Sequence, residues 1–423
     1  MADTLDSIGS AQTCESNRLV RAFESLRDPR YRWWFLAQVF SASGTMTSGV
    51  AQAWLVLKMT GSAIDIALIT ALMFLPTLLG GAWAGALVDR IDVRRLLIVT
   101  NAAFAVLAAA QAALIQAGGI RLWMLFAFAA LNGAVFAIDQ PARQVYVFEL
   151  VGPAKLTSAV GLYEVILNAS RALGPAVGGV LLATTGIASC LVFNGLTYLP
   201  TIALLLWLHP VAGPPPAAPA RAPGRIRAGL AVVRRDPVIL SCVALAAVSG
   251  MVFNLATTTP LFATRVLHLG GGGYGALTAC FGVGALPGAF MAASTHGAPA
   301  PRLVRRLALA TALSVLATCL TPIAAGAFAG LIAVGFCSIW LVATANTLVQ
   351  LAAPAGMRGL IMGIWAMALP GSNPVTGLFA GAAAQLSPRA GVGLSGALML
   401  VVLAATWRAL SPQRDATAAS PAP

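Results

Sequence analysis

Residues Ser158 to Leu182 read SAVGLYEVILNASRALGPAVGGVLL. This apolar stretch is long enough to cross a bilayer as a helix, which takes about 20 residues. It nevertheless carries Glu164, Asn168 and Arg171, whose i, i+4, i+7 spacing places them on one face of a helix. An ionisable group in the hydrocarbon core of a membrane is costly unless it faces protein or water. The stretch therefore predicts a polar pathway enclosed by other helices of the same chain.

The composition of the chain is that of a polytopic membrane protein. Hydrophobic residues make up 59% of the 423 residues and charged residues only 9%, and the mean hydropathy is +0.85. Soluble domains contain about 25% charged residues. The net charge of +13 does not indicate nucleic-acid binding, because the basic residues lie between apolar runs. The cysteines and histidines show no metal-ligand spacing, so no metal is expected.

Apolar runs of spanning length predict an all-α protein with twelve transmembrane helices in two pseudo-symmetric groups of six. The expected spans lie at about 33–57, 63–88, 95–117, 121–140, 158–184, 187–208, 238–264, 273–294, 303–325, 327–350, 358–386 and 390–409. The expected domains are an N-terminal tail (1–32), an N-terminal half (33–208), a Pro- and Arg-rich linker (209–237), a C-terminal half (238–409) and a C-terminal tail (410–423).

Basic residues predict the orientation, because they are enriched in the cytoplasmic loops of membrane proteins. Most of the 26 Lys and Arg residues lie in segments that are cytoplasmic if the N-terminus is inside. The outer loops contain only Lys58, Arg121, Arg265 and Arg389. We therefore expect both termini, and the linker, in the cytoplasm. Residues 18–31 of the first tail fit either a basic amphipathic helix or a disordered segment.

The fifth and eleventh predicted spans share a pattern of proline and glycine. In the fifth span, Pro175 and Gly178 come a little over 20 residues after the preceding loop begins. In the eleventh span, Pro374 and Gly377 come at nearly the same distance after the preceding loop. Interrupted segments at matching positions of two halves indicate the central site of a transporter. The same residues also fit ordinary close packing of helices, and both interpretations can hold together. The helix-bend motifs comprise Gly174, Pro175, Gly178, Gly179, Pro374 and Gly377.

The loop between the second and third predicted spans resembles the signature loop of the major facilitator superfamily. It contains Gly85, Asp89, Arg90, Arg94 and Arg95. The resemblance implies twelve helices in two halves, and a gating latch in which Asp89 docks against the positive end of the helix that begins near Arg358. Asp92 and Val93 depart from the usual glycine and basic residue, which weakens the expected latch. Alternatively, the arginines only hold the loop on the cytoplasmic side of the membrane, according to the positive-inside rule, and form no latch.

Three further stretches resemble a branch of bacterial exporters that includes the enterobactin exporter and macrolide-efflux proteins. They are residues 52–57, 139–144 and 170–175. The run from Gly174 to Gly179 is similar to a motif of the fifth span in proton-coupled antiporters, which implies export. A Gly-Asp pair frequent in this branch is replaced by Gly44-Thr45, which removes one candidate proton carrier.

Several intramembrane residues are candidates for proton coupling or for lining a cavity. Glu164 either exchanges a proton during transport or forms a structural pair with Arg171, with Asn168 between them. Asp139 and Arg143 fit an i, i+4 ion pair that anchors a loop, or part of a proton path. The uncharged candidates, which fit cavity lining and interhelical hydrogen bonding equally, are Gln52, Asn254 and Asn373.

The sequence thus predicts a secondary transporter that exports an amphipathic small molecule, such as a drug or siderophore, by proton antiport. The glycine run 270–273 lacks the Lys-Ser/Thr of a phosphate loop, so we expect a proton gradient and no cofactor to drive transport, and no enzymatic activity. The resemblance implies a monomer in a bacterial cytoplasmic (inner) membrane whose partners are substrate, protons and lipid. The alternatives are an uptake symporter or lipid flippase of the same fold, or a non-transporting membrane sensor.

Overall fold

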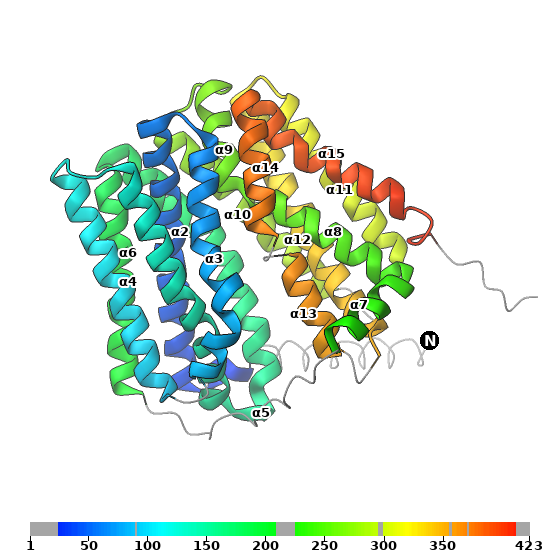
Figure 1. The fold of residues 1–423 in the computed structure, drawn as a ribbon, viewed down its shortest axis with the longest axis horizontal. Helices are drawn as coiled ribbons and strands as arrows, with labels where there is room; N and C mark the ends of the chain where they lie inside the picture. Colours follow the sequence, from blue (N-terminus) through cyan, green and yellow to red (C-terminus); the bar gives the residue numbers. More distant parts are fainter. Residues whose placement is uncertain are drawn as a thin grey trace, which may run out of the picture. The chain divides into compact units, whose positions relative to one another are not determined.

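The computed structural model describes residues 24–88, 91–208, 225–294, 299–354, 358–369 and 372–411 (Figure 1). All its regular elements within these ranges are helices. Some predicted features lie outside the described residues: most of the N-terminal tail with part of 18–31, Asp89 and Arg90, the linker from 209 to 224, and the C-terminal tail from 412.

The helices follow the order of the predicted spans. They are η1 (Glu24–Arg27), α2 (Pro29–Thr60), α3 (Ala63–Val88), α4 (Val93–Gln116), α5 (Leu122–Thr184), α6 (Ile187–Trp207), α7 (Arg225–Arg235), α8 (Pro237–Phe253), α9 (Leu255–Arg265), α10 (Gly271–Ser294), α11 (Pro301–Leu320), α12 (Ala324–Ala352), α13 (Arg358–Ala368), α14 (Asn373–Leu386) and α15 (Pro388–Thr406). The short helix α7 lies within the predicted linker.

Nine helical segments of the described ranges are long and apolar enough to cross a membrane, or ten if the bent pair of α8 and α9 is one span. The described residues therefore contain fewer helices of spanning length and apolarity than the twelve spans that the sequence predicts. Helix α2 has 32 residues, but its polar side chains, which include Gln38, Thr45 and Gln52, lower its mean hydropathy. The eleventh predicted span is divided into α13 and α14, which Figure 1 shows as separate helices.

The range of α5 contains the fourth and fifth predicted spans as two helices that meet at a kink in place of the predicted longer loop. Its one non-helical residue is Gly152, with φ 70° and ψ 175°. A positive φ is accessible to glycine at little cost, so the chain changes direction there. Residues before Gly152 stay helical because Ala142, Tyr146 and Leu150 recur on one face and are buried in the core.

The chain divides into two compact units. The first comprises residues 1–52 and 72–218, and the second comprises 53–71 and 219–423. Residues 53–71, from the end of α2 and the start of α3, belong with the second unit because they contact its helices. Trp54 stacks on Tyr274 with ring centroids 6.0 Å apart. Arg265 Nη2 donates to the carbonyl of Gly61 at 2.9 Å.

The core of the first unit contains large aromatic side chains at one end of its helices. Trp34 and Tyr146 lie with ring centroids 4.8 Å apart, and both are almost completely buried. The hydroxyl of Tyr31 donates to the carbonyl of Ala159 at 3.0 Å, which attaches the start of α2 to α5. Helices α4 and α6 pack side by side in the same unit (Figure 1).

The second half of α5 packs tightly against α2 through glycine. Thr47 Oγ1 donates to the carbonyl of Gly174 at 2.8 Å. A side chain at Gly174 would place its Cβ 2.7 Å from the carbonyl oxygen of Ser43. The small residues of the predicted bend motif therefore allow the two backbones to approach closely.

We predict that Gly174→Ala lowers the free energy of unfolding by about 1–3 kcal/mol, because its methyl group overpacks the contact of α5 with α2. Thermal unfolding of the purified protein in detergent measures the effect. Gly49→Ala on α2 is the matched control, since a Cβ there meets no atom within 4 Å. Equal midpoints for the two variants would contradict the proposed tight contact.

Candidate functional site

The two charged residues predicted as an i, i+4 pair form a salt bridge inside the first unit. Both lie on α5, and the Nε of Arg143 donates to Oδ2 of Asp139. Asp139 is only 2% exposed, and the side chain of Arg143 is 15% exposed. The pair is therefore buried in the helix bundle rather than placed on a solvated surface.

Two neighbouring helices complete the hydrogen bonding of the carboxylate. From α4, Thr100 Oγ1 donates to Oδ1 of Asp139 at 2.7 Å, and Asn101 Nδ2 lies 3.5 Å from the same oxygen. Both partners are buried, at 4% and 0% exposure. Hydrogen bonds donated to a carboxylate are stronger than those between neutral groups, so these two side chains of α4 hold Asp139 in a fixed position.

The guanidinium of Arg143 is held by polar side chains from α2 and α4. Its Nη1 donates to Oε1 of Gln38, and its Nη2 donates to Oδ1 of Asn101 at 3.4 Å. Arginine presents several donors in a fixed plane, so it can bind a carboxylate and two amides at once. Three helices thus meet at one charged pair. Sequence reasoning did not identify Gln38, Thr100 or Asn101, although their polar character in apolar helices was a usable signal.

The polar residues predicted on one face of the fifth span lie further along α5. Arg171 Nη1 donates to Oδ1 of Asn168 at 3.0 Å, and Asn168 is 4% exposed. Glu164 belongs to the same helix, but its side chain is outside the described part of the structure. The two interpretations of Glu164, proton exchange and structural pairing, both stay open predictions.

The predicted uncharged candidates take part in contacts between or along helices. Gln52 Nε2 donates to Ser48 Oγ at 3.2 Å and to Gln111 Oε1 of α4 at 3.4 Å. In the second unit, Asn254 Nδ2 donates to the carbonyl of Asn373 at 3.2 Å. Asn254 separates α8 from α9, and Asn373 begins α14, so the two interrupted spans meet at their breaks.

The predicted gating loop is described only in part. Gly85 lies near the end of α3, while Asp89 and Arg90 are outside the described residues, so the latch stays a prediction. Arg94 donates from Nη2 to the carbonyl of Leu206 at 2.6 Å, which fastens α4 to the end of α6.

The same loop supplies the cap of the next helix. Asp92 accepts a hydrogen bond from the backbone N–H of Arg95 at 2.9 Å. Asp92, which departs from the glycine usual in the signature loop, therefore stabilises the start of α4.

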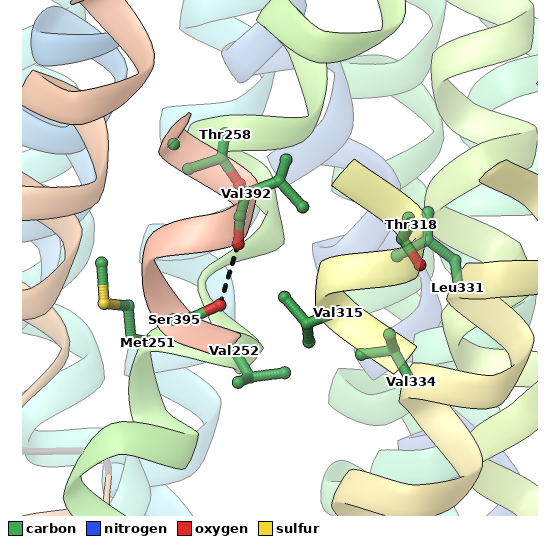
Figure 2. A pocket seen from close by; sticks show the side chains of 10 residues that line it. Met251, Val252, Thr258, Val315, Thr318, Leu331, Val334, Val392 and Ser395 are labelled. Atoms are coloured by element: carbon green, nitrogen blue, oxygen red, sulfur yellow. Dashed lines mark hydrogen bonds between the residues drawn. The ribbon is translucent and has the colours of Figure 1, made fainter. Parts of the chain in front are cut away.

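A small cavity lies within the second unit, among α8, α9, α11, α12 and α15 (Figure 2). Its volume is about 20 Å³, and a water molecule needs about 10 to 15 Å³. Most of its lining is apolar, including Met251, Val315 and Val392. The hydroxyl of Ser395 donates to the carbonyl of Val392 at 3.0 Å instead of pointing to a ligand. The cavity is therefore too small to hold an amphipathic substrate.

The sequence profile of the family described as "Transmembrane secretion effector" matches residues 20–423. The chain belongs to this family. Its members are transporters of the major facilitator superfamily, so the protein is a multi-pass membrane transporter. Among the described residues, no three His, Cys, Asp or Glu side chains lie close enough together to hold a metal ion.

Curated relatives of the transporter include exporters. The enterobactin exporter EntS of Citrobacter koseri is 26% identical over 397 residues, which cover 88% of this chain and 90% of that protein. The Staphyloferrin A transporter of Staphylococcus aureus is 27% identical over 42% of this chain and 45% of that protein. The multidrug efflux pump Tap of Mycobacterium tuberculosis is 33% identical over 36% and 37%. The last two matches therefore span less than half of either protein.

Solved structures share the fold at low identity. A bacterial homologue of the human lysosomal transporter Spinster aligns with a TM-score of 0.70 and 15% identity, over 90% of this chain and 97% of that chain. A bacterial homologue of the iron transporter ferroportin aligns with a TM-score of 0.65 and 17% identity, over 91% and 99%. These similarities establish the fold of the transporter and not its substrate.

We predict that Asp139→Asn destabilises the transporter by about 3–5 kcal/mol, because it leaves the guanidinium of Arg143 buried without a counter-charge. The double variant Asp139→Asn/Arg143→Gln should recover most of this loss. Thermal unfolding of the single and double variants in detergent checks the coupling. Additive losses in the double variant would show that the two side chains do not depend on each other.

Proposed function

We propose that the protein exports an amphipathic small molecule against the inward movement of protons, with Asp139 and Arg143 as the coupling pair. The observation that carries the proposal is the burial of this pair among Gln38, Thr100 and Asn101. A purely structural helix contact does not need an ionised pair, since apolar residues of similar volume stabilise an interior as well or better. A charge retained at this depth favours a functional role.

Proton binding is coupled to the conformation of the protein because the two protonation states of Asp139 favour different conformations. When Asp139 is ionised, it neutralises Arg143 and the arrangement described above is favoured. A proton on Asp139 removes the negative charge, leaves Arg143 uncompensated, and so raises the free energy of this conformation. Binding of a proton therefore shifts the population toward a conformation in which Arg143 finds other partners. A substrate that favours the ionised conformation competes with the proton, which is antiport.

The direction and substrate class are supported by different evidence. The relatives EntS and Tap are an exporter and an efflux pump, and the match to EntS covers most of both chains. The spans of the C-terminal half contain no Asp, Glu or Lys, and their arginines lie near helix ends. Walls of this composition suit a substrate with a large apolar surface, because few charged groups would need to be paired.

We also propose the membrane setting of the transporter. The loop charges favour both termini in the cytoplasm of a bacterial cell, with the protein in the cytoplasmic membrane. The proton gradient supplies the energy in place of a bound cofactor, and the functional unit is a monomer with no nucleic-acid partner.

We predict that Asp139→Asn abolishes substrate accumulation driven by a pH gradient. A drug and siderophore susceptibility panel on a deletion strain first identifies an exported compound. Inside-out membrane vesicles with an acidic interior are then expected to accumulate that compound with the wild-type transporter and not with Asp139→Asn. Asp65→Asn at the start of α3 is the matched control and should accumulate normally, since its carboxylate forms no part of the buried pair. Accumulation by Asp139→Asn at the wild-type rate would remove this carboxylate from the mechanism.

The same vesicles separate the proposed antiporter from a symporter. Antiport requires accumulation when the vesicle interior is acidic, whereas a symporter would accumulate the compound when the exterior is acidic. Glu164→Gln can be measured beside Asp139→Asn. Loss of accumulation at normal protein levels would assign a second proton site to α5, and unchanged accumulation would identify Glu164 as a structural residue.

A further inference from the structure

Polar side chains recur along one face of α2, from the level of the Asp139–Arg143 pair onward, inside the first unit; we call this row of side chains the line. On α2, Gln38, Thr45 and Gln52 are seven residues apart, which places them on one face of the helix about two turns from one another. Gln38 contacts Arg143, as described above. The other two residues each contact a different neighbouring helix at a greater distance along α2.

The middle of this line is the hydroxyl pair of Thr45 and Tyr198. Thr45 Oγ1 and the Tyr198 hydroxyl lie 3.0 Å apart, and Tyr198 is 4% exposed. The ring of Tyr198 stacks on Phe104 of α4, with centroids 5.4 Å apart and planes inclined by 19°. This packing fixes the ring, so the hydroxyl is held at one position on the line.

The far end of the line is the amide pair of Gln52 and Gln111. Gln52 Nε2 donates to Ser48 Oγ at 3.2 Å and to Gln111 Oε1 at 3.4 Å. Gln111 is 2% exposed. Polar contacts of α2 with α4, α5 and α6 therefore occur at three successive levels of the same unit.

Four buried polar atoms of these helices have no hydrogen-bond partner among the described residues. They are Gln38 Nε2, Gln111 Nε2, Asn194 Oδ1 and Thr201 Oγ1. Gln38 and Gln111 occupy the two ends of the line, while Asn194 and Thr201 flank Tyr198 on α6. A buried polar atom without a protein partner is a position where a bound water molecule is expected.

A structural role alone accounts poorly for this arrangement. Each unsatisfied buried group lowers stability by a free energy that an apolar side chain of the same shape would not incur. A line that served only to hold α2, α4 and α6 together would be more stable if its polar atoms were paired or replaced. Its polar atoms instead follow one direction through the unit and end at the one buried carboxylate that the structure describes there.

We propose that Thr45 and Tyr198 are positioning residues of a water-assisted proton path that runs inside the first unit, from Gln52 and Gln111 to Asp139. The inference rests on the proposed function of Asp139. A proton added to a water molecule at the Gln52 end moves by successive exchange, in which each oxygen forms one O–H bond as it gives up another. The final step forms an O–H bond on the Asp139 carboxylate. Every hydroxyl and water on the line is neutral before and after the transfer.

The charged and titratable groups around this path are few in the described part of the unit. Helix α5 supplies Asp139, Arg143 and Tyr163, and α6 supplies Tyr198. Helices α2 and α4 contribute amides and hydroxyls to the path, but no charged group. The hydroxyl of Tyr163 donates to Gln140 Oε1 at 3.2 Å and so is engaged beside the line. The pair of Asp139 and Arg143 is neutral in sum, which lets a proton approach it.

The test measures proton arrival at Asp139 and needs no transported compound. The full-length protein is reconstituted in liposomes, exposed to a rapid drop in external pH, and followed by time-resolved infrared spectroscopy of the protonated carboxyl band. The band that disappears in Asp139→Asn reports Asp139. We expect Tyr198→Phe, which keeps the stacked ring, to slow the rise of this band by about tenfold while its final amplitude is unchanged. Thr45→Val should have the same effect.

Tyr146→Phe is the matched control, because Tyr146 is also fully buried in the first unit but packs on Trp34 in the aromatic core. It should protonate Asp139 at the wild-type rate. A rate within twofold of wild type in both Tyr198→Phe and Thr45→Val would overturn the path and leave Asp139 as the proton site. A wild-type protein with no band sensitive to Asp139→Asn would instead overturn the proposed function.

Discussion

The first unit depends on one electrostatic constraint: a carboxylate and a guanidinium inside a helix bundle must neutralise each other. Asp139 and Arg143 meet this constraint on one helix, and Gln38, Thr100 and Asn101 complete their hydrogen bonds. The arrangement is stable only while both groups are charged, because either one alone would be an unpaired charge in a medium of low dielectric constant. A single proton can therefore change which conformation is favoured.

The packing of the unit is consistent with such a change. Thr47 and Gly174 bring α2 and α5 into backbone contact, and small residues at such contacts allow helices to lie close together. Helix α5 is kinked at Gly152, and the residues on both sides of the kink are helical. The charged pair precedes this kink and the bend motif follows it.

Part of this account could be predicted from sequence. Apolar length predicts most of the spans, and i, i+4 spacing predicts the Asp139–Arg143 pair, because both are local properties of a helix. The polar character of Gln38 and Asn101 in apolar helices marks them as unusual, but their contact with the pair could not be predicted because it arises only through tertiary packing. The fourth and fifth predicted spans are separate helices on either side of the kink at Gly152, but the first of them is longer than predicted because Tyr146 and Leu150 are buried in the core. Residues 53–71 group with the second unit through contacts such as Trp54 with Tyr274, which are also tertiary.

In the proposed mechanism, substrate and proton compete through Asp139. Isothermal titration calorimetry tests this competition with the compound that the susceptibility panel identifies, titrated into purified protein in two buffers with different heats of protonation. Because coupling is reciprocal, the wild-type protein should release up to about one proton per molecule bound, so the measured heats should differ between the buffers. Asp139→Asn should give the same heat in both. Equal heats for the wild-type protein in both buffers, at every pH tested, would contradict proton antiport at this pair.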